Sequence, residues 1–328
     1  MNLVRTIFSI LLLFFVLGCA KNTREQQNIK NDNHFQFTYS VTVPHISTPF
    51  TTGEILVPIP RTNDYQVVHD VKIETNGSYE VLQEPEYNNK YAKILFSDSL
   101  QSDINLTVVI DITRKIEDNY ITQKKGTVEQ TDILKRFLQA DSLVPIDGVV
   151  ASAASALVAD SMTTIEKAQA FYDNLYKTMQ YDKSGEGWGR GDALYACDIR
   201  KGNCTDFHSL FIGMARSVGI PARFLIGFPT SPEKDSSVVG GYHCWAEFYD
   251  TVYGWVPVDI SEAVQNPEKK EFLFGNLDND RLMFSVGRDI KILTDSGEKS
   301  FNFFIYPQVF IDGKPYNNFI KKFEFKKL

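Results

Sequence analysis

Beyond its N-terminus, this 328-residue chain has no apolar run long enough to cross a membrane as a helix. The formal charge of −7 is spread along the sequence without a basic stripe, which argues against nucleic acid as a partner. Its four cysteines and five histidines show neither Cys-Xaa-Xaa-Cys nor His-Xaa-Xaa-Xaa-His spacing, and the glycines at 185–191 match no phosphate-binding pattern. We therefore predict no metal and no cofactor.

The first nineteen residues have the pattern of an export signal. Arg5 gives a positive start, residues 7–16 form an apolar core too short to span a membrane, and Val-Leu-Gly-Cys ends the segment at Cys19. The pattern resembles a bacterial lipoprotein signal, in which Cys19 becomes the lipidated first residue; an ordinary cleaved signal is the alternative. Residues 20–34 are polar and lack aromatics, as expected of a flexible tether.

This N-terminal pattern predicts an exported protein that is attached to a membrane of the bacterial cell envelope through the lipid on Cys19. No acidic residue directly follows Cys19, which by analogy favours the outer membrane, on its periplasmic or surface side.

The remaining sequence divides into a strand-rich part and a mixed part. Residues 35–118 contain alternating segments separated by Asn, Gly and Ser, which predicts a β-sandwich with a binding or spacer role. Residues 128–328 begin with helical patterns, including a Thr-Xaa-Xaa-Glu capping box at 163–166, and return to strands after Asp259. We expect these later strands to complete the sheet of the second domain or a flanking one, so that the fold class is α+β.

A helix is predicted to begin at Cys204 and to end near Ser217, because apolar residues recur there at three- and four-residue steps. The recurring residues are Phe207, Leu210, Phe211, Met214 and Val218. Gly219 can adopt the left-handed conformation that closes such a helix. The first turn of a helix has unpaired N–H groups and the positive end of the macrodipole, which favour a thiolate at Cys204.

His243 and Asp259 follow on two segments with strand patterns, joined by a short turn. Cysteine acyl transfer needs an imidazole that takes the thiol proton and later gives it to the leaving amine, and a carboxylate that fixes the ring tautomer. Cys204, His243 and Asp259 supply these three types in that order.

Several ordered motifs around these residues resemble the transglutaminase-like superfamily of papain-type cysteine enzymes. They are Gly-Asn-Cys-Thr-Asp-Phe, Gly-Ile-Pro-Ala-Arg, His243 with Trp245, and Gly-Trp-Val-Pro-Val-Asp ending at Asp259, within about residues 163–262. The longer string before Cys204 is similar to a bacterial subgroup, here with a lipoprotein signal. The resemblance implies a helix-borne nucleophile, Cys204, facing a sheet-borne general base, His243, and its orienting residue, Asp259.

The resemblance also implies an oxyanion site formed by the Cys204 backbone N–H and a donor from an upstream segment. Gln180, Tyr181 and Trp188 are the candidates for this donor, although aromatic residues in such a loop can equally serve packing.

His208 lies one helical turn after Cys204, where the commoner pattern has a small residue. We expect His208 and Trp245 to line the cleft, with His208 as a competing base as the alternative.

Three cysteines remain after the signal: Cys197, Cys204 and Cys244. An odd number in an oxidising compartment leaves one thiol free, and a Cys197–Cys244 disulfide is one way to spare Cys204. A metal site formed by these cysteines with His208 and His243 is a further interpretation, but no ligand spacing supports it.

Together these observations predict an enzyme that forms a Cys204 thioester on a peptide or glutamine carboxamide of a peptide or protein substrate. Water as acceptor makes it a peptidase or amidase, and a lysine amine makes it a cross-linker; we favour hydrolysis because water is always present. The alternative is a non-catalytic envelope protein that binds peptides or proteins in an aromatic groove containing Trp188, Trp245 and Trp255.

Overall fold

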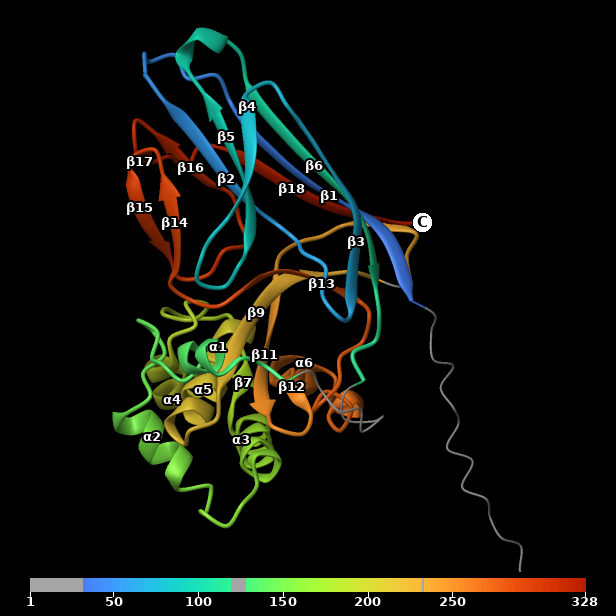
Figure 1. Cartoon of the computed structure of the whole chain (residues 1–328), viewed down its shortest axis with the longest axis vertical. Helices are drawn as coiled ribbons and strands as arrows, with labels where there is room; N and C mark the ends of the chain where they lie inside the picture. The colour runs from blue at the N-terminus through green and yellow to red at the C-terminus, as the bar shows by residue number, and fades with distance from the viewer. Residues whose placement is uncertain (1–31, 119–127, 232) are drawn as a thin grey trace, which may run out of the picture. The chain divides into compact units, whose positions relative to one another are not determined.

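The computed structural model describes residues 32–118, 128–231 and 233–328. The predicted signal peptide, Cys19 and most of the predicted tether therefore lie outside the described residues. Residues 32–328 form one compact unit, which combines a β-sandwich with a mixed helix and sheet layer (Figure 1).

The first sheet of the sandwich has five strands in the order β10-β18-β1-β6-β3. They are β1 (Asn33–Val43), β3 (Gln66–Thr75), β6 (Ile104–Arg114), β10 (Ser236–Val238) and β18 (Ile320–Lys327). In β1, buried residues alternate with more exposed ones, because successive side chains of a strand point to opposite faces. Phe37 and Tyr39 thus lie on the buried face of this sheet, where their rings pack against Phe228 and Phe284.

The second sheet of the sandwich has the order β17-β16-β2-β5-β4. Its strands are β2 (Gly53–Ile59), β4 (Ser78–Gln83), β5 (Lys90–Phe96), β16 (Gln308–Ile311) and β17 (Lys314–Pro315). A separate hairpin pairs β14 (Ile290–Thr294) with β15 (Gly297–Phe301), and Asp98–Leu100 form a short 3-10 helix.

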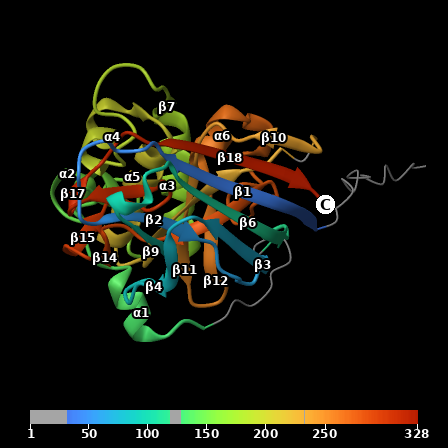
Figure 2. The ribbon, with the colours of Figure 1, turned by 90° about the horizontal axis from the view of Figure 1, so that it is seen from above.

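The C-terminal strands complete the sandwich. The sandwich therefore includes strands from both of the predicted parts, 35–118 and 128–328. Strand β18 pairs with β1 from Phe35 opposite Lys327 to Thr42 opposite Ile320, and β16 pairs with β2. Both views place β18 beside β1 (Figures 1 and 2). The alternation within a strand determines which side chains face the core but not which distant strand becomes its neighbour, so the sequence pattern did not reveal this pairing.

The other layer contains an antiparallel sheet in the order β12-β11-β9-β13. Its strands are β9 (Ala222–Pro229), β11 (His243–Asp250), β12 (Gly254–Val258) and β13 (Arg281–Val286). Helix α5 (Cys204–Ser217) packs on β11 and β9, and every residue from Cys204 to Arg216 is buried. The predicted limits of this helix are thus confirmed.

Smaller elements surround α5. They are α1 (Thr131–Arg136), α2 (Gly148–Ser155), α3 (Thr164–Thr178), α4 (Ala193–Ile199), α6 (Ile260–Gln265), β7 (Gln180–Tyr181), β8 (Lys201–Gly202) and a 3-10 helix at Pro267–Lys269. The predicted capping box is present at the start of α3, where the Thr163 hydroxyl accepts from the Glu166 N–H and the Glu166 carboxylate accepts from the Thr163 N–H. The mixed α+β fold class is therefore confirmed.

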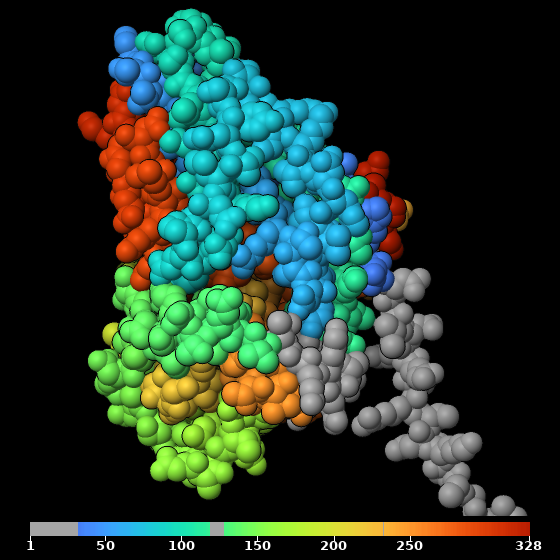
Figure 3. Space-filling view, viewed as in Figure 1, coloured from blue at the N-terminus to red at the C-terminus, as the bar shows by residue number. Residues whose placement is uncertain are grey.

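One aromatic cluster joins the two layers. Phe228 of β9 packs against Phe323 of β18, with ring centroids 4.4 Å apart, and against Phe37 of β1 at 5.1 Å. Figure 3 shows the N-terminal strands, in blue and cyan, adjoining the C-terminal ones in red. Among the described residues, no helix has the length and apolarity needed to cross a membrane.

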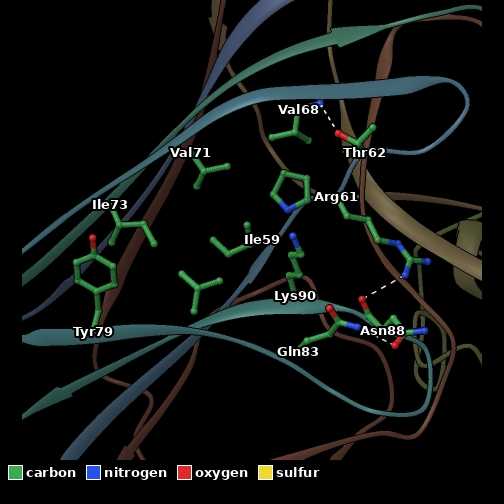
Figure 4. Close-up of a pocket in the computed structure, with 12 residues that line it drawn as sticks. Ile59, Arg61, Thr62, Val68, Val71, Ile73, Tyr79, Gln83, Asn88 and Lys90 are labelled. Atoms are coloured by element: carbon green, nitrogen blue, oxygen red, sulfur yellow. Dashed lines mark hydrogen bonds between the residues drawn. The ribbon is translucent and has the colours of Figure 1, made fainter.

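The sandwich also has an open edge, where β3 and β4 line a pocket of about 520 Å³. Val71 and Ile73 from β3 face Tyr79 from β4 across the pocket, and Lys90 lies beside Ile59 in its lining (Figure 4). Neither Cys204 nor His243 lines this pocket, so it is separate from the predicted catalytic residues.

Candidate active site

Cys204 occupies the first position of α5, and its local backbone is fixed by a second capping box. The Asn203 side chain accepts from the Thr205 N–H at 3.0 Å, and the Asp206 carboxylate accepts from the Asn203 N–H at 3.0 Å. Asp206 also accepts from the N–H groups of Gly189 and Gly191, at 2.7 and 3.0 Å. This carboxylate therefore ties the glycine-rich loop to the start of the helix that carries the thiol.

The Cys204 sulfur, which is buried, receives hydrogen bonds from two neighbours on β11. Burial alone would raise the pKa of the thiol, but hydrogen bonds with the Cys244 and His243 side chains, the charge of His243 and the Cys244 backbone N–H lower that pKa to about 5. The thiolate is the nucleophilic form of cysteine. At neutral pH the Cys204 side chain is therefore a thiolate.

His243 lies between this sulfur and Asp259. Its Nε2 is 2.5 Å from Asp259 Oδ2, which leaves Nδ1 to face the sulfur of Cys204. Burial disfavours the imidazolium, but the charge and hydrogen bond of Asp259, together with Cys204, raise the pKa of His243 well above its usual value. Thiolate and imidazolium thus stabilise each other as an ion pair.

Asp259 is held as a carboxylate by a dense set of donors. Burial would raise its pKa, but His243 and Arg281 lower it well below the usual value. Arg281 Nη1 donates to Oδ2 at 2.7 Å, and the Ser261 hydroxyl and the Glu262 N–H each donate to Oδ1 at 3.0 Å. Asp259 is also the N-cap of α6, so the helix start and the carboxylate fix each other.

Sequence reasoning missed Arg281. It lies on β13, is 1% exposed, and binds Glu262 and Asp278 in addition to Asp259. Its guanidinium carbon is 5.4 Å from the centre of the Trp245 ring, so Trp245 packs against Arg281. Arg281 lies 22 residues after Asp259 in the sequence, so no local pattern indicated that the two side chains would meet.

His208 is fully buried beneath the triad. Its Nε2 accepts from the Ile260 N–H at 3.2 Å, and its ring also hydrogen-bonds the Cys204 backbone. Burial lowers the pKa of His208 to about 4, so the ring is neutral at physiological pH. These contacts use the ring nitrogens for backbone groups, which supports a packing role beneath the cleft rather than the competing role as base.

The structure separates the three oxyanion candidates. Trp188 Nε1 donates to Gly185 O at 3.1 Å within its own loop, and the Gln180 side chain is exposed. Burial and the nearby Cys204 raise the pKa of Tyr181, whose ring packs on Phe207 of α5. Tyr181 therefore lies close enough to Cys204 for the charge of the thiolate to affect its hydroxyl.

Sequence reasoning also missed Tyr242, which directly precedes His243. Its hydroxyl accepts from Asn203 Nδ2 at 3.1 Å, and its pKa is raised by burial and by the proximity of Cys204. Its backbone N–H donates to the Tyr306 hydroxyl at 3.4 Å. Tyr242 and Tyr306 therefore both lie near the thiol. The position of Tyr242 directly before the candidate base His243 was the one signal available in the sequence.

Comparisons with known proteins agree with this site. A model of the transglutaminase-like superfamily matches residues 151–260. An uncharacterized protein of Haemophilus influenzae is 30% identical over 94% of this chain and 95% of its own length. The chain belongs to the transglutaminase-like superfamily.

The solved structures that resemble this chain include a proposed cysteine protease from Cytophaga hutchinsonii. It is 18% identical, has a TM-score of 0.54, and matches over 90% of this chain and 98% of its own. The periplasmic domain of TgpA from Pseudomonas aeruginosa is more distant, with 15% identity and a TM-score of 0.38 over 73% of this chain and 91% of that domain. The first of these likenesses supports the fold.

The three cysteines within the described residues are free: Cys197, Cys204 and Cys244. The considered Cys197–Cys244 disulfide is thus not formed, because Cys197 lies half-buried on α4 while Cys244 is buried on β11 and contacts Cys204. Among the described residues, the groups of side chains close enough to share a metal ion include no cysteine. The interpretation as a cysteine and histidine metal site therefore finds no support.

Proposed function

We propose that the chain is a cysteine enzyme that cleaves peptide or glutamine carboxamide bonds through a thioester on Cys204. The observation that carries this proposal is the contact of the Cys204 sulfur with His243, whose other nitrogen is 2.5 Å from Asp259. In this proposal Cys204 is the nucleophile, His243 the general base and acid, and Asp259 the residue that orients the ring.

The reaction would begin when the Cys204 thiolate attacks the carbonyl carbon. The backbone N–H of Cys204 at the start of α5 has no partner within the helix, so it is available to the developing oxyanion, with Tyr181 as the candidate second donor. The His243 imidazolium then protonates the departing nitrogen, and the thioester forms. Water, deprotonated by His243, would release the acid and restore the thiol.

Hydrolysis is favoured over cross-linking because water is always available to the thioester. A glutamine peptide incubated with the protein and a primary amine distinguishes the two outcomes by mass spectrometry. Free acid in excess of amide adduct is expected, and adduct in excess would show a cross-linking enzyme. The Cys204→Ala variant, which should give neither product, is the control.

A non-catalytic peptide-binding protein on the same fold is the second candidate, favoured by the aromatic side chains of Tyr181, Tyr242 and Tyr306 around the thiol. Peptide binding without turnover, equal in wild type and Cys204→Ala, would support it over the enzyme.

We further propose export and lipid anchoring through Cys19, on the strength of the N-terminal sequence pattern. Metabolic labelling with a fatty acid should mark the wild-type protein in the membrane fraction. The Cys19→Ala variant should lose the label, and labelling that persists in this variant would refute the anchor.

A further inference from the structure

A second thiol lies directly against the candidate nucleophile. Cys244 follows His243 on β11, and its side chain faces α5, where its sulfur is 3.7 Å from Nδ1 of His208. The Cys244 and Cys204 side chains hydrogen-bond each other, and the Cys244 N–H also binds the Cys204 sulfur. Both residues are almost completely buried. Acyl transfer does not need this second sulfur, because the role of base belongs to His243.

We propose that Cys204 is a site of oxidation by peroxide and that Cys244 resolves the product into a reversible Cys204–Cys244 disulfide. The inference rests on the same Cys204 thiolate as the proposed function, but it concerns a different reaction.

The chemistry is balanced with hydrogen peroxide as the only co-reactant. The Cys204 thiolate attacks one peroxide oxygen, the O–O bond breaks, and the products are a sulfenic acid and hydroxide, which takes the proton of the His243 imidazolium to become water. The Cys244 sulfur then attacks the Cys204 sulfur, the S–O bond breaks, and the hydroxyl leaves as water with the Cys244 proton. Two thiols and one peroxide thus give one disulfide and two water molecules.

The surroundings assign different roles to the two sulfurs. Cys204 accepts hydrogen bonds from His243 and from Cys244, which is the environment of the thiolate that reacts with peroxide. Burial and the neighbouring Cys204 raise the pKa of Cys244, so Cys244 keeps its proton until the charge on Cys204 is lost. Cys244 is therefore suited to resolve the sulfenic acid on Cys204 rather than to be oxidised first.

Access favours a small oxidant. The His243 side chain beside Cys204 is 16% exposed, which opens the site to a molecule of the size of peroxide while the thiol itself is shielded. Cys197 is more exposed, lies on α4 next to Arg200 and forms no disulfide. It provides an internal control for non-selective oxidation.

Peptide mapping tests the proposal because trypsin places each cysteine on a separate peptide: 191–200 for Cys197, 202–216 for Cys204 and 235–269 for Cys244. The purified protein is treated with equimolar peroxide, blocked with an alkylating agent and digested without reductant. Peptide 202–216 should appear joined to 235–269, and dithiothreitol should separate them. A disulfide to 191–200, or no disulfide while Cys204 becomes oxidised, would overturn the proposal.

Variants sharpen the test. In Cys244→Ala, the sulfenic acid has no resolving thiol, so irreversible sulfinic acid on Cys204 should rise by about tenfold or more over wild type. Cys197→Ala should behave as wild type. If Cys204 is oxidised further to the same extent in wild type and Cys244→Ala, Cys244 does not resolve it.

The two proposals fail separately. A disulfide that forms in a protein without amidase or peptidase activity would refute the proposed function alone. Activity that survives peroxide in wild type, with no disulfide formed, would refute the oxidation site alone.

Discussion

At the scale of single residues, the charge of Cys204 is determined by its neighbours more than by its burial. Hydrogen bonds from Cys244 and His243 outweigh the cost of placing a thiolate in a buried position. Asp259 extends this arrangement, because it stabilises the imidazolium that faces the sulfur. The reactivity of Cys204 is thus a property of the whole triad.

The pH dependence of Cys204 reactivity follows from these pKa shifts. Because the pKa of the thiol is lowered to about 5, the thiolate is present above pH 5 and is lost as the pH falls below it. The rate of alkylation by iodoacetamide, measured on peptide 202–216, should therefore rise to half of its plateau near pH 5. A midpoint near 8.5, the ordinary value for cysteine, would show that the ion pair does not form.

Arg281 should act as a positioning residue. In Arg281→Met, Asp259 loses a donor at 2.7 Å, and we expect kcat to fall by about tenfold to a hundredfold with little change in KM, because the orientation of His243 is affected and not substrate binding.

Lys269→Met is the matched control for Arg281, because Lys269 binds Glu262 and Asp278 but not Asp259. Removing one partner from a buried ion pair can cost about 3–5 kcal/mol of stability. Arg281→Lys, which keeps the charge, is therefore measured alongside. Equal loss of kcat in the Lys269 and Arg281 variants would contradict the positioning role.

At the scale of elements, the start of α5 depends on Asp206. Its carboxylate accepts from the backbone N–H groups of Gly189, Gly191 and Asn203. In Asp206→Asn one acceptor oxygen becomes an NH₂ donor that faces these donors, so the free energy of unfolding should fall by about 1–3 kcal/mol. Urea denaturation measures the change, and activity should fall with it, because the glycine-rich loop is released from the Cys204 helix.

The Thr163 cap of α3 is the control for Asp206. Thr163→Ala removes an ordinary capping hydroxyl, which should cost about 1 kcal/mol of stability while activity per folded molecule stays unchanged. A stable, fully active Asp206→Asn variant would contradict the role of Asp206.

Local spacing in the sequence predicted some features of these elements but not their contacts with distant segments. The limits of α5 and the cap of α3 follow from spacings within a few residues, and both were predicted. The Asp206 contacts to Gly189 and Gly191 were not, because they join a helix to a loop 15 and 17 residues earlier. Cys204, His243 and Asp259 were proposed from residue type and order, whereas the contacts of Arg281 and Tyr242 depend on the packing of strands that no local pattern specifies.

At the scale of the whole molecule, the sandwich and the catalytic sheet share one core. The C-terminal strands close the sandwich, so the catalytic segment lies between two parts of the chain that pair with each other. The prediction of an N-terminal sandwich was correct in architecture and incomplete in its strands. The reason is that strand partners separated by hundreds of residues leave no periodic signal.

Phe228 should therefore stabilise both layers together. Phe228→Ala removes a ring that packs on Phe37, Phe284 and Phe323, and we expect a loss of about 3–5 kcal/mol in one cooperative unfolding transition. Tyr79→Ala, at a residue that is 51% exposed, should cost far less. Two separate transitions in calorimetry would show that the sandwich and the catalytic sheet unfold independently.

The central claim, that His243 activates the Cys204 thiol, is tested most directly by the labelling of Cys204 with a chloroacetyl peptide at pH 6 in two histidine variants. We predict that His243→Ala reduces the labelling rate on peptide 202–216 by about a hundredfold or more, while His208→Ala, once shown to be folded, retains most of it. Undiminished labelling in His243→Ala would contradict the account.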